Sequence, residues 1–153
     1  MRKLSMILVI AAMTIGILPG AETLSEKKVS FSLGISGLAV NPDSGDARAL
    51  FGPAAVVHFN LGRSLFVAPE LAVGIGGLYS GATVNVRLSK IFLGAGAGLL
   101  YFFSERQEIQ GDGMLKLQLG TQGAKWRFYA AFVSNVFSGA WLSGAQVTVV
   151  YVF

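Results

Sequence analysis

The sequence contains no cysteine and little charge. Without cysteine it can form no disulfide, thiolate metal site, cysteine nucleophile or lipid-modified cysteine. Charged residues make up 13% of the 153 residues, while hydrophobic residues make up 53%. An average globular protein has roughly 25% charged residues. A chain this apolar must either bury long helices or expose apolar surface to lipid.

Several other patterns are missing. Beyond the N-terminal segment, no run of 18 apolar residues is free of charges or strong breakers, which disfavours membrane-spanning helices. No basic cluster could follow a phosphate backbone, so nucleic acid is not an expected partner. Gly94, Gly96 and Gly98 lack the spacing of a dinucleotide loop, and the sequence has no cluster of metal ligands. We therefore expect neither a cofactor nor a metal.

The N-terminus has the composition of an export signal. Two basic residues precede an apolar stretch at 4–18 and small residues at 19–21. This order is typical of a secretory signal peptide, and the apolar stretch is shorter than the ~20 residues that span a bilayer as a helix. We expect a cleavable signal peptide over 1–21 and a short N-terminal segment over 22–27, with an uncleaved anchor as the alternative.

The remaining segment, 28–153, alternates repeatedly between apolar residues and polar or small ones. Successive side chains of a strand point to opposite faces, so each such stretch has one apolar face. The other faces are mostly Gly, Ala, Ser, Thr, Asn and Gln, which suit a crowded barrel interior better than an exterior in water. Apolar residues outside and polar residues inside are typical of an outer-membrane β-barrel. The last stretch alternates most clearly, with these residues on one face: Val147, Val149, Tyr151 and Phe153.

The alternation predicts an all-β fold, an eight-stranded antiparallel up-and-down transmembrane β-barrel. Ten residues tilted by about 40° climb ~25 Å, the height of the lipid-facing band. Unpaired strand edges cost several kcal/mol in hydrocarbon, so the first strand must pair with the eighth. Eight strands enclose a lumen that side chains fill, which argues against a general diffusion porin. The predicted strands are 28–38, 54–62, 65–77, 81–89, 91–103, 113–121, 125–137 and 142–153.

The predicted connections alternate between tight turns and longer loops, apart from short outer turns near Tyr79 and Gly139. The longer ones, 41–52 and 104–112, hold most of the acidic residues. Outer-membrane barrels have short periplasmic turns and longer outer loops, so these two loops are expected to face outward. Pro69 interrupts the third predicted strand because it cannot donate a ladder hydrogen bond, and we expect a local bulge there.

Aromatic residues near the predicted strand ends are expected to form girdles at the two membrane interfaces. An inward orientation is the alternative for Phe66 and Phe92. The expected periplasmic girdle contains Trp126, Phe66, Phe92 and Phe153, and the outer one Tyr79, Tyr101, Phe103 and Trp141.

Five ionisable residues are expected to point into the lumen: Glu70, Arg87, Lys116, Arg127 and His58. Because buried charges need partners, we expect an ion-pair network that holds the barrel together, with Glu70 pairing with Arg87. A gated or ligand-binding lumen is the alternative. His58 is the only histidine, and we expect a hydrogen-bonded interior residue rather than a catalyst.

The alternating last strand that ends in Phe153, together with the export segment, resembles small bacterial outer-membrane barrels of the OmpA and OmpX type. The resemblance covers 28–153 in pattern only. It implies that the chain passes through the periplasm to the outer membrane and lies among its lipids. It also implies that the barrel-assembly machinery reads an assembly signal made of Phe153, Tyr151, Val149 and Val147.

These features predict a structural or surface-interaction role, with 41–52 and 104–112 as contact surfaces for an extracellular partner that the sequence does not identify. A lipid-modifying outer-membrane enzyme is one alternative, and a secreted lipocalin-like carrier is another. Deacylases among the small barrels pair a histidine with a serine two residues later, whereas Asn60 follows His58 at that spacing. We therefore expect no catalytic residues and no enzyme activity.

Overall fold

The computed structural model describes residues 28–42, 47–103, 110–135 and 142–153. The expected signal peptide, 1–21, and the segment 22–27 lie outside the described residues, as does Trp141. In the part of the chain that is described, no helix has the length and hydropathy needed to cross a membrane.

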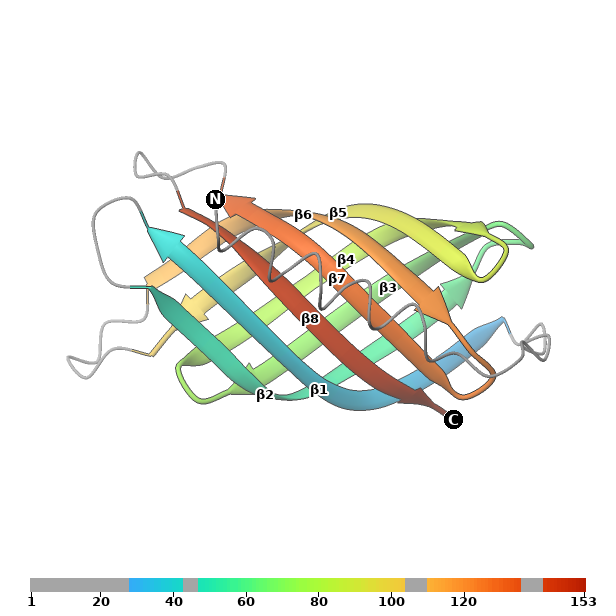
Figure 1. The fold of residues 1–153 in the computed structure, drawn as a ribbon, viewed down its shortest axis with the longest axis horizontal. Helices are drawn as coiled ribbons and strands as arrows, with labels where there is room; N and C mark the ends of the chain where they lie inside the picture. Colours follow the sequence, from blue (N-terminus) through green and yellow to red (C-terminus); the bar gives the residue numbers. More distant parts are fainter. Residues whose placement is uncertain (1–27, 43–46, 104–109, 136–141) are drawn as a thin grey trace, which may run out of the picture.

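Within these ranges the chain forms eight strands that close into a barrel (Figure 1). Each strand pairs antiparallel with the next, and β1 pairs antiparallel with β8. The predicted eight-stranded up-and-down barrel is therefore confirmed. Its strands are β1 (Val29–Pro42), β2 (Arg48–Asn60), β3 (Leu65–Gly74), β4 (Gly77–Leu88), β5 (Ile91–Phe102), β6 (Gln110–Gln122), β7 (Trp126–Asn135) and β8 (Leu142–Val152).

The two ends of the barrel differ in their connections. The turns at 61–64, 89–90 and 123–125 lie at one end, which we call the turn end. There the N–H of Asn60 donates to the Lys28 carbonyl at 2.8 Å, so the start of β1 lies at this end too. The opposite end, the loop end, carries the β1–β2, β3–β4, β5–β6 and β7–β8 connections. The predicted tight turns are confirmed to within a residue or two.

At the loop end, β1, β2, β4 and β6 extend further than predicted, whereas β3 and β5 end before their predicted bounds. Val40 of β1 pairs with Arg48 of β2, so most of the predicted loop 41–52 is strand, and β6 begins within the predicted loop 104–112. The remainder of both loops lies largely outside the described residues. At the end of β1 and the start of β2 the inward residues Leu38, Val40 and Leu50 are apolar, so a pattern of polar inward residues did not reveal these strand ends.

Pro69 lies inside β3 without a bulge. It pairs with Ala82 of β4 in an uninterrupted ladder. In the β2–β3 ladder, pairing lapses at Gly52 and Pro53, and opposite Pro69 it lapses again at Val57 and His58, resuming in the same register after this second gap. The predicted bulge is wrong because no extra residue is inserted. Pro69 lacks the N–H that would point toward β2, so the pairing lost to the proline is confined to the gap at Val57 and His58.

The outward face of the barrel is apolar, and the inward face carries the polar residues. Phe31 of β1 is 43% exposed and Val84 of β4 is 51% exposed, whereas their neighbours Ser32 and Asn85 are fully buried. The predicted orientation of the two faces is confirmed.

The lumen holds more apolar volume than the sequence led us to expect. A loop-end cluster and a turn-end cluster of buried apolar residues flank the polar groups. Gly81 and Gly98 face the Tyr79 hydroxyl, where a Cβ would clash, so small residues make room for a large inward ring. The loop-end cluster contains Leu38, Val40, Leu50, Ala54, Ala72, Tyr79, Leu100, Phe102, Met114 and Val133. The turn-end cluster contains Val56, Phe66, Ala68, Phe92, Tyr129 and Val150.

Only part of the predicted aromatic girdles faces outward. At the turn end, the Trp126 and Tyr151 rings lie 5.2 Å apart between centroids, and Tyr151 and Phe153 lie 5.3 Å apart. Phe31 adds a fourth ring, 6.3 Å from Phe153. At the loop end, Phe103 is exposed.

Three residues assigned to these girdles point into the lumen instead. Phe66, Phe92 and Tyr79 are almost completely buried, so a girdle role is wrong for them. Their positions in the strands explain the error, since Phe66 lies four residues from Glu70 on the same face of β3. Nearness to a strand end was a weaker guide than the two-residue period.

Candidate functional site

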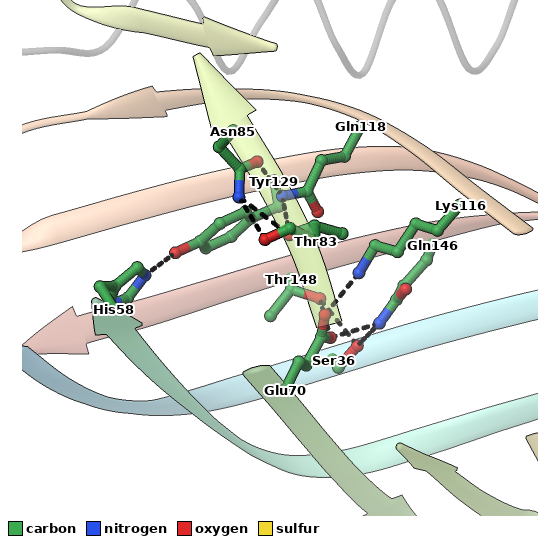
Figure 2. Close-up of polar contacts among 10 residues, drawn as sticks. All are labelled: Ser36, His58, Glu70, Thr83, Asn85, Lys116, Gln118, Tyr129, Gln146 and Thr148. Atoms are coloured by element: carbon green, nitrogen blue, oxygen red, sulfur yellow. Dashed lines mark hydrogen bonds and ion pairs between the residues drawn. The ribbon is translucent and has the colours of Figure 1, made fainter. Parts of the chain in front are cut away.

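The centre of the lumen is organised around the Glu70 carboxylate (Figure 2). Lys116 of β6 forms an ion pair with it across the barrel. The Lys116 side chain is 1% exposed, and the Glu70 side chain is 9% exposed. Gln146 of β8 donates from Nε2 to Glu70 Oε1 at 2.6 Å and to Ser36 Oγ at 2.9 Å. Thr148 Oγ1 lies 3.4 Å from the same carboxylate oxygen. These contacts tie β1, β3, β6 and β8 together.

A second polar group joins β4 to β6 (Figure 2). Gln118 Nε2 donates to Thr83 Oγ1 at 2.9 Å and to Asn85 Oδ1 at 2.5 Å. Asn85 Nδ2 also donates to Thr83 Oγ1 at 2.9 Å. Gly94 faces the Asn85 side chain, and a Cβ there would overlap it. Gly94 of β5 thus gives room to the Asn85 amide of the neighbouring strand.

The single histidine lies in a third group, between a serine and a tyrosine. His58 Nδ1 lies 3.4 Å from Ser32 Oγ, and its Nε2 lies 2.5 Å from the Tyr129 hydroxyl. All three side chains are buried, and Phe66 packs 5.8 Å from the imidazole. The serine lies on the neighbouring strand, 26 residues away in sequence, so no local motif indicated it. A serine–histidine–acid site also needs a carboxylate on the second ring nitrogen, and here a tyrosine takes that place.

At the turn end, two arginines surround one phenylalanine. The Arg87 guanidinium carbon lies 4.6 Å from the Phe66 ring centroid, and that of Arg127 lies 5.8 Å from it. Arg87 also donates from Nη2 to the Asn60 side-chain carbonyl. Both distances are within the range of cation–π attraction.

The structure places all five candidate lumen residues on inward-facing positions, but in three separate groups. Glu70 and Lys116 meet at the centre, His58 lies beside Tyr129, and the two arginines lie at the turn end.

The expected Glu70–Arg87 pair does not form. Glu70 is level with Gly81 of β4, and Arg87 lies six residues further toward the turn end, ~20 Å along the strand. Lys116 reaches the carboxylate from across the lumen instead.

Sequence reasoning missed the uncharged members of these groups. It selected only ionisable residues, although the two-residue period places the uncharged ones on the same inward faces. Tyr129, for example, follows Arg127 by two residues. The missed residues are Ser32, Ser36, Thr83, Asn85, Gln118, Tyr129, Gln146 and Thr148.

The chemistry available in the lumen is hydrogen bonding and ion pairing. Among the described residues, no group of three or more histidine or acidic side chains could hold a metal ion. The central contacts run between strands that are not neighbours, such as β3 and β6. They therefore connect opposite walls of the barrel.

Comparison with known proteins gives structural similarity only. No family model matches the sequence, and neither does any curated protein. Ail, the attachment invasion locus protein of Yersinia pestis, is similar in structure, with a TM-score of 0.47, 16% identity, and coverage of 82% of this chain and 97% of Ail. A second Ail structure, in complex with the heparin analogue sucrose octasulfate, gives a TM-score of 0.44 at 17% identity, with coverage of 82% and 97%. The N-terminal β-barrel domain of Pseudomonas aeruginosa OprF gives 0.48 at 14% identity, with coverage of 80% and 97%.

Proposed function

We propose that this chain is an integral protein of a bacterial outer membrane with a structural or surface-interaction role. The observation that carries the proposal is a closed ladder whose outer wall exposes large apolar side chains on every strand. A barrel dissolved in water would need charged residues at these positions, whereas lipid accommodates apolar ones. One such residue from each strand, each 41–61% exposed, is, from β1 to β8, Ile35, Phe59, Leu71, Val84, Leu93, Leu117, Phe132 and Val147.

The turn end faces the periplasm in this proposal. Its connections are short, as periplasmic turns of outer-membrane barrels are. The exposed rings of Trp126 and Phe153 lie at this end, at the height where aromatic side chains meet lipid headgroups. The loop end would then face outward, with 41–52 and 104–112 as contact surfaces.

The lumen supports a structural role better than a diffusion pore. Phe66 and Phe92 pack edge to face 5.3 Å apart near the turn end, and Leu100 and Met114 are buried near the loop end. Between them lies the Glu70–Lys116 pair. Planar bilayers containing the purified protein should show no open-channel conductance of the porin type. Stable porin-sized conductance would contradict this part of the proposal.

We propose no enzyme activity. His58 is fully buried on the inward face of β2, so the barrel wall separates it from the outer face, where a lipid substrate would lie. Lipid A mass spectra from cells with and without the gene should be identical. A changed acylation pattern would instead favour the lipid-modifying alternative.

Assembly is proposed to proceed through β8. Val147 and Phe153 of this segment are exposed on the outer wall, Val149 and Tyr151 are half-buried there, and β8 closes the barrel by pairing with β1. Replacing the exposed ring in Phe153→Ala should lower the amount of folded protein in the outer membrane. The matched control is Val29→Ala, which removes an exposed apolar side chain at the same end of the barrel.

Cell fractionation tests the proposal as a whole. The tagged full-length protein should be recovered with the outer membrane and should migrate differently on gels before and after boiling. Recovery in the soluble periplasm without detergent would favour the lipocalin-like carrier. Recovery in the inner membrane would also overturn the proposal.

A further inference from the structure

The described charged side chains at the turn end all carry the same sign of charge. The described acidic residues are Glu70, at the centre of the lumen, and Asp112, on the loop-end half of β6. The described part of the turn end therefore has no acidic residue to balance its bases. Those bases are Lys28, Arg63, Arg87, Lys90, Lys125 and Arg127.

Two of these bases project into the lumen, and their donors are not all used. Arg127 is 2% exposed, yet its Nε and Nη1 atoms have no hydrogen-bond partner. Arg87 Nε is also buried without a partner, although Nη2 donates to Asn60. The Ser30 hydroxyl, on the same end of β1, is a further buried group without one. Buried charges and donors are costly unless a partner satisfies them.

Glu70, the one described acidic residue in the lumen, already has other partners than the two arginines. Glu70 pairs with Lys116 and accepts from Gln146. It lies ~20 Å along the strand direction from the level of Arg87. The two arginines are thus held close to one phenylalanine ring without a described carboxylate between them.

We propose that Arg87 and Arg127 form a binding site for a phosphate group in the turn-end mouth of the lumen. A guanidinium presents parallel N–H donors that match the oxygens of a phosphate, and two of them supply compensating charge. The Ser30 hydroxyl is a third donor at this end. The exposed bases around the rim, Lys90 and Lys125 among them, raise the local concentration of anions at the mouth.

The geometry also gives the direction of entry. Arg87 is only partly buried, whereas Arg127 lies completely inside. Phe66 packs against Phe92, and Phe92 packs against Tyr129, which lies two residues further from the turn end than Arg127 on β7. A phosphate group would therefore enter from the turn end and stop at this aromatic layer. It would belong either to a free ion or to a lipid headgroup at the rim.

Phosphorus NMR and calorimetric titration of the full-length protein test the proposal. The protein is folded in a maltoside detergent free of phosphate, and inorganic phosphate is added at fixed ionic strength. A second arm replaces the free ion with micelles containing a short-chain phosphatidylglycerol. Saturable binding is expected in at least one arm, and which arm binds identifies the source of the phosphate. Absence of saturable binding in both arms overturns the proposal.

Variants then locate the site. Arg87→Gln and Arg127→Gln should each weaken binding roughly tenfold or more, because each removes charge-assisted hydrogen bonds. Lys125→Gln removes a rim charge outside the lumen and should change the affinity by no more than about twofold. If Arg127→Gln fails to fold, Arg87→Gln alone tests the site, because Arg87 is only partly buried. Unchanged binding in Arg87→Gln, or an equal loss in Lys125→Gln, would overturn the site.

Discussion

The two faces of each strand are specified in different ways. Outward positions need only be apolar, so side chains as different in shape as Val84, Leu117 and Phe132 can occupy them. Inward positions need particular partners, as Lys116 needs Glu70. The outer wall therefore depends on a class of residue, whereas the lumen depends on which residues meet across it.

Removing the central carboxylate should have the largest effect. Glu70→Ala leaves the Lys116 ammonium buried without a counter-charge, and the free energy of unfolding should fall by about 3–5 kcal/mol. Urea unfolding in lipid vesicles measures the change. The double variant Glu70→Ala, Lys116→Met removes both charges and should recover most of the loss. An unchanged unfolding midpoint for Glu70→Ala would show that the ion pair contributes nothing.

A charge on the outer wall comes next. Leu117, near the middle of β6, is 61% exposed, and Leu117→Arg should cost about 2–4 kcal/mol in a bilayer. The matched variant Leu117→Val keeps an apolar group and should unfold close to the parent. If the arginine is tolerated in vesicles as well as the valine, the apolar wall does not face lipid.

Loss of one hydroxyl inside the lumen should have a smaller effect. Tyr129→Phe removes the group that meets His58 Nε2 and leaves this buried nitrogen without its partner. We expect a loss of about 1–3 kcal/mol. Tyr151→Phe, on the outer face, is the control and should be nearly neutral. Equal effects of the two substitutions would remove the distinction between the faces.

The smallest effect is expected where the outer wall meets the turn end. Leu88 is 56% exposed at the last position of β4, next to the turn at 89–90. Leu88→Arg should cost about 0–1 kcal/mol, because a long side chain there reaches the membrane interface. A cost equal to that of Leu117→Arg would contradict the placement of the turn end at the membrane interface.

Alternation in the sequence was sufficient to predict the strand number and the orientation of the faces. It worked because the side-chain period of a strand is two, so Ser32 and Phe31 had to lie on opposite sides. It failed at the loop end, where the inward residues Leu38, Val40 and Leu50 are apolar, and the pairing of Val40 with Arg48 was therefore missed.

The contacts across the lumen could not be predicted in the same way. They depend on the stagger between strands, which places Glu70 level with Gly81 rather than near Arg87. The approach of Ser32 to His58 likewise requires the register of β1 against β2. A single sequence gives each residue its face but not its height in the barrel.

Methyl NMR tests the orientation of the two faces most directly. The protein would carry labelled valine methyl groups and be folded in micelles containing a lipid with a spin label in its acyl chain. If the apolar face lies against lipid, the outward Val84, Val86 and Val147 methyl signals should broaden strongly. The inward, buried Val56, Val133 and Val150 signals should broaden little. The reverse pattern would contradict the placement of apolar side chains against lipid.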